Sequence, residues 1–297
     1  MNAFDPVLAA VDFSDDARRA AHRAAVVAAE QGARLGLLHV MSNASAASLR
    51  DLLRPHAGIP AQVLGSARAM LEELASDLAA RTGVAATPRV EQGEVLPSLL
   101  AAARQAALLV VGAHGWNPLR DLILGSTAER LLGRCRRPVL VVRRPARGPY
   151  RRVIVAMDFS PHSLNALATA MRIAPGADIV LVHAFGIPFE GKLRIAGVDE
   201  ERLREYRTQS RHQALTEMVA MVASIEGDRS RLSHAVAHGH PPQLILAKAR
   251  QLRADLVVIG RRGRSAAEDF LLGSVTRHVL SDAKCDVLVV QEPPGGR

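Results

Sequence analysis

Two glycine-rich segments of this chain have the residue types and the spacing to hold a phosphate group. The first runs Gly112-Ala113-His114-Gly115, followed by nine residues and then Gly125-Ser126-Thr127. The second runs Gly260-Arg261-Arg262-Gly263, followed by nine residues and then Gly273-Ser274-Val275-Thr276. Each follows a short apolar run, 108–111 or 256–259, and precedes a segment of helical pattern. A strand, a glycine loop and a helix start together place backbone N–H groups where they can bind phosphate.

An aspartate ends the first apolar run of each half, Asp12 in one and Asp158 in the other. The second runs end at residues 39–40 and 183–184, and the fourth runs end at the first glycine of each loop. In open α/β sheets, ligands bind outside the carboxyl ends of the strands, where the strand order reverses. A carboxylate would repel phosphate there, so both aspartates are predicted to accept hydrogen bonds from an adenine amino group or a ribose hydroxyl.

The chain repeats itself over nearly its whole length. Residues 7–14 match 153–160, residues 37–40 match 181–184, and residues 138–142 match 286–290. A period of this length indicates a duplicated domain rather than a solenoid repeat. We predict two nucleotide-binding domains, 1–147 and 148–297, joined at a segment rich in proline and glycine, 143–150.

Each half alternates short apolar runs with helical patterns, which predicts a parallel sheet covered by helices on both faces. Strands are expected at 7–11, 35–39, 86–91, 108–111 and 138–142, and again at 152–156, 179–183, 232–237, 255–259 and 286–290. Helices are expected at 15–31, 61–81, 95–105 and 126–132, and again at 161–174, 199–225, 241–251 and 274–281. Ser14 and Ser160 are predicted N-caps. Residues 41–60 and 186–197 lack a clear pattern and are predicted to be loops.

The composition favours a soluble cytoplasmic protein. The net charge is +9, but only three of the 38 cationic residues are lysines, a skew typical of genome composition rather than of a nucleic-acid face. Aromatic residues make up 3% of the chain, so stacking platforms for single strands are lacking. No apolar run reaches the ~18 residues of a membrane span, and the first residues lack the basic segment of a signal peptide. Neither a membrane nor a nucleic acid is expected as a partner.

The cysteines and histidines give no metal or disulfide signature. Cys135 and Cys285 do not occupy matching positions in the two halves, and we expect both to be thiols. Three histidines near one strand, His234, His238 and His240, lack a cysteine or carboxylate at metal-ligand spacing, so no metal site is expected. His39 and His183 recur at strand ends, where a hydrogen-bonded structural role is expected and a role beside a nucleotide is the alternative.

The motif Gly-x2-Gly-x9-Gly-Ser/Thr, present in both halves, resembles that of the universal stress protein family in its tandem form. The resemblance extends over both halves almost end to end. In each half it implies a Rossmann-like, open five-stranded parallel sheet of strand order 3-2-1-4-5. It also implies an intramolecular pseudo-dimer in which the last strands of the two halves pair. Family members with this motif bind ATP, so the resemblance implies ATP, alone or with Mg²⁺, and a regulatory role in the stress response.

Site residues are carried over from the family by position. The implied adenine and ribose contacts are Asp12, Val40 and Val111 in the first half, and Asp158, Ala184 and Ile259 in the second. The implied phosphate contacts are Gly112, His114, Gly115, Gly125, Ser126 and Thr127, and then Gly260, Arg262, Gly263, Gly273, Ser274, Val275 and Thr276. The resemblance implies no catalytic residue.

The two halves differ where the phosphates would lie. After the second glycine, the second half has Arg264-Ser265, as is common in the family, whereas the first half has Trp116-Asn117-Pro118. Ala128 stands in the first half where Thr276 stands in the second, and the first half lacks a counterpart of Asp255. Because arginine forms forked hydrogen bonds to phosphate, at least one of Arg261, Arg262 and Arg264 is expected to pair with it. Ala184 is smaller than Val40, which would loosen the second adenine pocket. We expect the second site to bind the triphosphate more tightly.

Three classes of function fit the sequence. The favoured one is an ATP-binding regulatory protein with slow or no hydrolysis, because neither loop contains a lysine and no Gly-x4-Gly-Lys-Ser/Thr motif occurs. The alternatives are a weak ATPase or nucleotidyl-transfer enzyme of the same fold group, and a basic scaffold that binds nucleic acid or protein. The expected partners are an adenine nucleotide, an unidentified protein, and a second copy of the chain in a homodimer.

Overall fold

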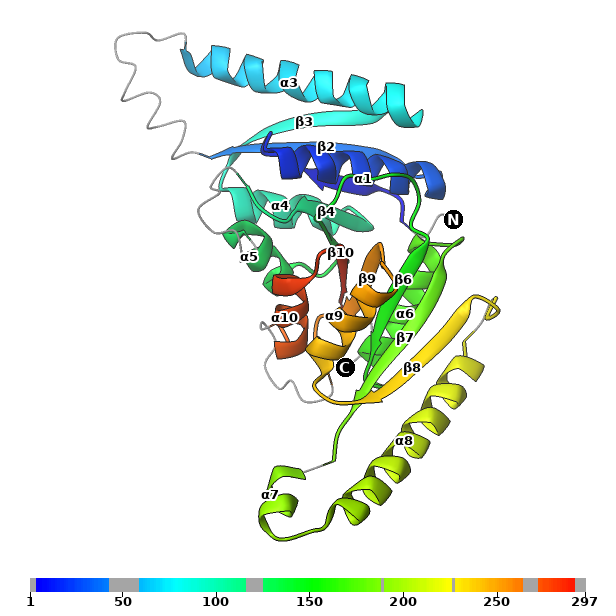
Figure 1. Ribbon diagram of the computed structural model, residues 1–297. Helices are drawn as coiled ribbons and strands as arrows, with labels where there is room; N and C mark the ends of the chain where they lie inside the picture. The colour runs from blue at the N-terminus through cyan, green and yellow to red at the C-terminus, as the bar shows by residue number, and fades with distance from the viewer. Residues whose placement is uncertain are drawn as a thin grey trace. The chain divides into compact units, whose positions relative to one another are not determined.

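The computed structural model describes residues 4–42, 59–115, 125–187, 190–225, 228–263 and 272–291. The chain divides into two compact units, Met1–Pro149 and Tyr150–Arg297 (Figure 1). The sequence differences noted at Trp116, Asn117, Pro118, Arg264 and Ser265 lie outside the described residues, as does most of the segment 41–60.

The first unit is a parallel sheet with the strand order β3-β2-β1-β4-β5. Its strands are β1 (Val7–Ala10), β2 (Leu35–Ser42), β3 (Ala86–Gly93), β4 (Leu108–Gly112) and β5 (Val139–Val142). Its helices are α1 (Asp15–Gln31), α3 (Ile59–Thr82), α4 (Val95–Arg104) and α5 (Ser126–Arg134). Side chains alternate between the faces of a strand, and the first four residues of β4 are all buried. Both faces of this central strand are therefore covered, as a parallel sheet requires.

The second unit repeats this architecture with the strand order β8-β7-β6-β9-β10, again parallel throughout. Its strands are β6 (Arg152–Met157), β7 (Asp178–Phe185), β8 (Leu232–His238), β9 (Leu256–Gly260) and β10 (Asp286–Val290). Its helices are α6 (Pro161–Ile173), α7 (Glu190–Ile195), α8 (Glu200–Ala223), α9 (Pro241–Gln251) and α10 (Ser274–Asp282). Each unit thus has the order 3-2-1-4-5 that the family resemblance implies.

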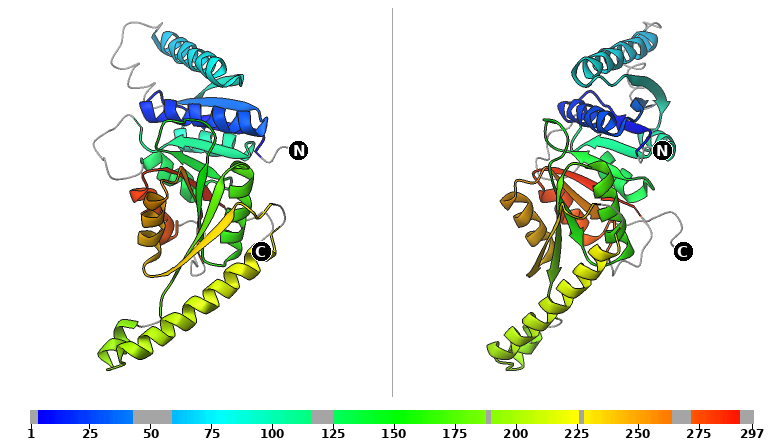
Figure 2. Two further views of the ribbon diagram at one scale, coloured as in Figure 1. Left: turned by 45° about the vertical axis from the view of Figure 1, so that its right-hand side comes forward. Right: turned by 90° about the vertical axis from the view of Figure 1, so that its right-hand side faces the viewer.

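The short helix α7 corrects one prediction, because it forms within the segment 186–197 that the sequence predicts to be a loop. None of its residues is buried, so its sequence lacks the apolar period from which a helix is predicted. Figure 2 shows that α7 and the first turns of α8 project beyond the strands of this unit. Smaller differences concern strand ends: β2 continues to Ser42 and β7 to Phe185, because each stays paired to its outer neighbour.

The predicted N-caps are confirmed in both units. Ser14 Oγ accepts a hydrogen bond from Ala17 N at 3.2 Å, and Ser160 Oγ accepts one from Ser163 N at 3.2 Å. Such caps contribute about 1 kcal/mol each and fix where the helix begins. They therefore set the start of α1 and α6 shortly after the strand whose end, in both units, carries the aspartate of the site described below.

The second unit begins with a buried polar contact. Tyr150 is 2% exposed, and its hydroxyl donates to Asp286 Oδ2 at 2.8 Å. Asp286, the first residue of β10, is itself 1% exposed. A buried carboxylate loses much of its hydration, so the hydrogen bond from Tyr150 replaces one that water donates in the unfolded chain.

Both cysteines, Cys135 and Cys285, are buried free thiols. In the part of the chain that the structure describes, no helix is both long enough and apolar enough to span a membrane.

Candidate functional site

A cavity of about 420 Å³ lies at the carboxyl ends of β6 and β9 in the second unit. These neighbouring strands flank the point where the strand order reverses, the usual ligand position in open α/β sheets. The volume falls within the range of small-molecule sites. All ten residues that the sequence predicts for this site line the cavity: Asp158, Ala184, Ile259, Gly260, Arg262, Gly263, Gly273, Ser274, Val275 and Thr276.

An apolar wall completes the cavity, and the sequence analysis missed it. The additional lining residues are the apolar Ala156, Met157, Val182, Pro241, Ile245 and Leu272, together with the polar Ser163. Val182 and Ile245 are 3% exposed and Ile259 is 5% exposed. Their apolar period only marks them as core, so no sequence signal separates the residues that face a cavity from those that pack solidly. A wall of this kind can accommodate the faces of an aromatic ring.

The aspartate at the end of the first strand is held in the same way in both units. Asp158 Oδ1 accepts hydrogen bonds from Ser160 N at 3.1 Å and from Ser160 Oγ at 2.5 Å. Asp12 Oδ1 accepts the corresponding bonds from Ser14 at 3.0 and 2.5 Å. Each carboxylate is therefore fixed through one oxygen, before any ligand is considered.

The second glycine of each loop lies against the other oxygen of that carboxylate. A Cβ added at Gly263 would lie 2.8 Å from Asp158 Oδ2, and one at Gly115 would lie 2.7 Å from Asp12 Oδ2. Both distances are shorter than real Cβ contacts, so any side chain here would displace the loop or the aspartate. Glycine is required at this position because the loop backbone passes directly over the carboxylate.

The first glycine packs against the helix that follows the aspartate. A Cβ at Gly112 would lie 2.8 Å from the backbone carbon of Asp16, and one at Gly260 would lie 3.2 Å from His162 Cβ. The third glycine closes the loop: Gly125 N donates to Ala113 O at 2.9 Å, and Gly273 N donates to Arg261 O at 3.0 Å. The loop is thus held by glycine packing and by backbone hydrogen bonds.

The third glycine is also the N-cap of the next helix, and it supplies no capping side chain in either α5 or α10. The first N–H groups of a helix have no partner within the helix, and they carry the positive end of its dipole. Ser126 and Thr127 occupy this helix start in the first unit, and Ser274 and Val275 occupy it in the second. This arrangement suits an anion.

A strained phenylalanine follows each aspartate. Phe13 has φ 66° and Phe159 has φ 62°, a region that non-glycine residues adopt at a cost of about 1–3 kcal/mol. Each ring lies against a histidine of the next strand, with centroids 4.6 Å apart for Phe13 and His39 and 4.3 Å apart for Phe159 and His183. His39 Nδ1 lies 2.7 Å from Val11 O, and His183 Nδ1 lies 2.9 Å from Met157 O. Because a carbonyl only accepts, both Nδ1 atoms donate, so both histidines are hydrogen-bonded to the strand backbone.

In the first unit the predicted residues gather at the same edge of the sheet. Asp12 follows β1, Val40 lies in β2, and Val111 and Gly112 end β4. His114 and Gly115 continue the loop, and Gly125 leads into Ser126 and Thr127 at the start of α5.

The structure shows what two of the differences between the halves do. Thr276 is 2% exposed, and its hydroxyl donates to Gly260 O at 2.8 Å, so it anchors the loop where Ala128 of the first unit cannot. The prediction that Asp255 marks a difference near the phosphates is wrong. Its carboxylate accepts hydrogen bonds from Arg151 N and Arg152 N, both at 3.0 Å, at the amino end of the sheet. It lies at the edge opposite to the cavity and has no bearing on phosphate.

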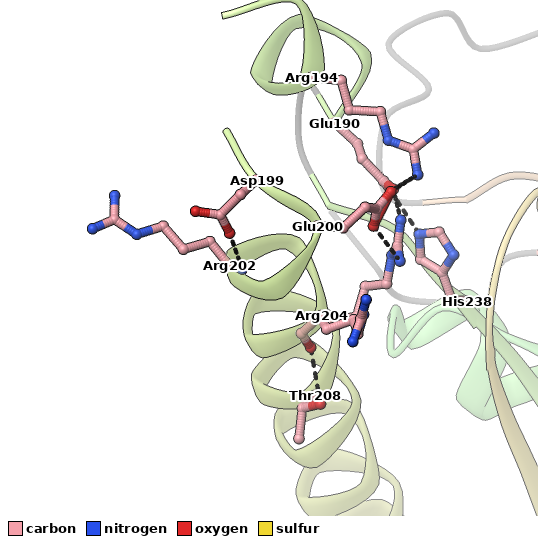
Figure 3. Close-up of polar contacts among 9 residues, drawn as sticks. Glu190, Arg194, Asp199, Glu200, Arg202, Arg204, Thr208 and His238 are labelled. Atoms are coloured by element: carbon pink, nitrogen blue, oxygen red, sulfur yellow. Dashed lines mark hydrogen bonds and ion pairs between the residues drawn. The ribbon is translucent and has the colours of Figure 1, made fainter. Parts of the chain in front are cut away.

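A cluster of ion pairs fixes α7 beside the outer strand of the second unit (Figure 3). Glu190 of α7 pairs with Arg207 of α8, and its Oε2 lies 2.8 Å from His238 Nε2 at the end of β8. Arg194 of α7 pairs with Glu200 of α8 at 2.8 Å. His238 is also in edge contact with Phe185, the residue after Ala184 of the cavity wall. This role accounts for one of the three histidines weighed as metal ligands.

We expect a Glu190→Gln variant to raise amide hydrogen exchange in α7 several-fold at pH 7, measured by mass spectrometry. Hydrogen bonds from Arg207 and then from His238 lower the pKa of the Glu190 carboxyl from its ordinary value of 4.5, against the opposing effect of desolvation. Because the folded pKa is lowered, the stabilisation is present above 4.5 and is lost as the pH falls through the folded value. The exposed Glu201→Gln serves as the control. Equal exchange in both variants would show that the cluster does not hold α7.

Comparison with known proteins agrees with this architecture. The Universal stress protein family matches the chain twice, over residues 3–143 and 149–291. A universal stress protein of Mycobacterium tuberculosis is 30% identical over 217 residues, which cover 70% of this chain and 66% of that relative. A universal stress protein of Methanocaldococcus jannaschii is 31% identical over 152 residues, which cover 48% of this chain and 84% of that relative.

Solved structures resemble the chain over its full length. The crystal structure of a universal stress protein from Archaeoglobus fulgidus has a TM-score of 0.68 at 20% identity, covering 97% of this chain and 98% of that one. A universal stress protein from Pseudomonas aeruginosa has a TM-score of 0.64 at 19% identity, covering 98% of this chain and 94% of that one. At this identity the likeness shows the fold. With the family matched in both units, the chain belongs to the universal stress protein family, in its tandem form.

Proposed function

We propose that this chain binds adenine nucleotides, ATP foremost, at the carboxyl edge of each sheet, and that it serves as a regulatory protein with slow or no nucleotide hydrolysis. Membership of the universal stress protein family supports the stress-response part of this role. The observation that carries the nucleotide proposal is the cavity of about 420 Å³, which is lined by all ten predicted residues of the second unit.

The cavity offers a matching surface to each part of an adenine nucleotide. The apolar wall of Val182, Ile245 and Ile259 suits the adenine ring, and the carboxylate of Asp158 suits an amino or hydroxyl donor. The helix start at Ser274 and Val275 suits phosphate oxygens. The close backbone approach at Gly263 leaves the space that a Cβ would fill. The residues present therefore fit the nucleotide. Mg²⁺ remains an expectation from the family resemblance.

The first experiment identifies and counts the nucleotide released from protein that is purified without added ATP. We expect adenine nucleotide in an amount comparable to the protein. Absence of nucleotide, together with no binding of added ATP in calorimetry, would overturn the proposal. Salt-dependent DNA binding in its place would favour the basic scaffold, because counterion release makes such binding fall steeply with salt.

Turnover is expected to be slow, with steady-state hydrolysis of ATP below about 1 s⁻¹. Phosphoryl transfer depends on positioned cations and a positioned nucleophile, and the described loop residues include no lysine. Phosphate release should be measured on the full chain with and without Mg²⁺. A rate within the usual enzyme range would favour the alternative, a nucleotide-hydrolysing enzyme of the same fold group.

A further inference from the structure

We propose that the second residue of the helix that follows the first strand, Asp16 in the first unit and His162 in the second, sets how many phosphates each site accepts. The second site would take the triphosphate, and the first would prefer adenine ligands with fewer charged phosphates. This inference rests on the nucleotide-binding function proposed above, and it adds a division of ligand class between the two sites.

In the first unit a carboxylate already occupies the phosphate loop. Asp16 Oδ2 accepts a hydrogen bond from the backbone N–H of His114 at 3.1 Å, and it lies 3.0 Å from His114 Nδ1. His114 stands between the first two glycines, where a loop N–H group would otherwise be offered to a phosphate oxygen. The Asp16 side chain is 17% exposed, so its charge is only partly screened by water.

The same carboxylate pairs with Arg19, one turn later in α1, through its other oxygen. This pair offsets part of the negative charge, but the Arg19 side chain is 39% exposed and such surface pairs are weak. Around the loop, the first unit thus carries Asp15, Asp16 and Arg19, followed by Ala113 and His114 on the loop itself.

In the second unit the corresponding helix positions carry no formal charge, and two arginines stand on the loop. A Cβ at Gly112 would lie 3.0 Å from Asp16 Cβ, and one at Gly260 would lie 3.2 Å from His162 Cβ, so Asp16 and His162 occupy equivalent places. On the helix, the positions of Asp15, Asp16 and Arg19 are taken by Pro161, His162 and Asn165. On the loop, the positions of Ala113 and His114 are taken by Arg261 and Arg262. Arg262 lines the cavity. Like charges near a ligand disfavour its charged form and its binding, whereas arginine favours phosphate.

A reciprocal exchange tests the inference, using full-length chains in which one site is closed. With Gly273→Glu closing the second site, Asp16→His should tighten ATP binding by about tenfold in titration calorimetry, as one charge-assisted hydrogen bond corresponds to a factor of this order. With Gly125→Glu closing the first, His162→Asp should weaken ATP binding by about tenfold. Adenosine binding should change less than about threefold in either pair, because the exchange acts on phosphate.

Two further variants keep the test independent of folding. Asp16→Asn removes the charge but keeps an acceptor for His114, and it should give part of the gain. Glu73→Gln, at an exposed position of α3, removes an equal charge outside the loop and should leave ATP affinity nearly unchanged. If ATP binds to the singly closed chains but the exchanges leave its affinity unchanged, this inference fails and the proposed function stands. If no variant binds any adenine ligand, both fail.

Discussion

Replacing Gly273 by glutamate is expected to weaken nucleotide binding in the second unit at least a hundredfold, while the unit stays folded. Gly273 has φ −58° and ψ 149°, which any residue adopts, and an added Cβ would make only ordinary contacts, the nearest at 3.4 Å from Arg261 O. The carboxylate would stand at the start of α10 and act as a built-in anion there, where the helix dipole favours it. It would take the place of a phosphate, and losing two charge-assisted hydrogen bonds corresponds to a hundredfold or more.

The matched control is Gly176→Glu in the same unit. Gly176 is exposed, nothing lies within 4 Å of its added Cβ, and it adds the same charge away from the cavity. Titration calorimetry of the full chain should lose the tighter of the two binding events in Gly273→Glu and keep both in Gly176→Glu. If Gly273→Glu retained the tighter event, the assignment of that event to the second unit would be wrong.

The largest expected effect on stability comes from the buried contact at the start of the second unit. Tyr150→Phe removes the hydroxyl that donates to Asp286 and leaves a carboxylate that is 1% exposed with one donor fewer. A lost hydrogen bond to a buried charged group costs about 2–3 kcal/mol of unfolding free energy. The ring itself is retained, so no cavity contributes to the result.

Tyr206→Phe is the matched control, because Tyr206 is the only other tyrosine of the chain and is 46% exposed. Guanidinium unfolding should be followed by far-ultraviolet circular dichroism, which reports both units, and by the fluorescence of Trp116, the single tryptophan, which belongs to the first unit. We expect Tyr150→Phe to lower the midpoint of the transition that the tryptophan does not report. Equal midpoints in the two tyrosine variants would mean that the buried contact contributes nothing.

The strands and helices follow from local pattern because each half repeats a strand and helix alternation with clear caps, whereas the strand order is implied by the family resemblance. The helix α7 could not be predicted in this way, since it is held by Glu190, Arg207 and His238, which are far apart in the sequence. The ends of β2 and β7 depend on pairing with an outer neighbour, which a single segment does not encode.

The glycines and aspartates of the site can be predicted from the sequence because their spacing follows directly from the loop geometry. The apolar wall is not readable, because Val182 and Ile245 have the same pattern as solid core. Asp16 also escapes notice, since acidic residues are common in the first turn of any helix. Only the comparison of Asp16 with His162, at equivalent places in the two units, could have drawn attention to it.

The way the loop is held has an evolutionary consequence. Its path depends on three glycines, on the turn from aspartate to serine, and on backbone hydrogen bonds, all of which both units share. The intervening side chains, Ala113 and His114 in one unit and Arg261 and Arg262 in the other, do not determine that path. After the duplication, substitutions at these positions could change the charge of one copy without refolding it. A duplicated site of this kind allows one copy to change its ligand while the other copy keeps its own.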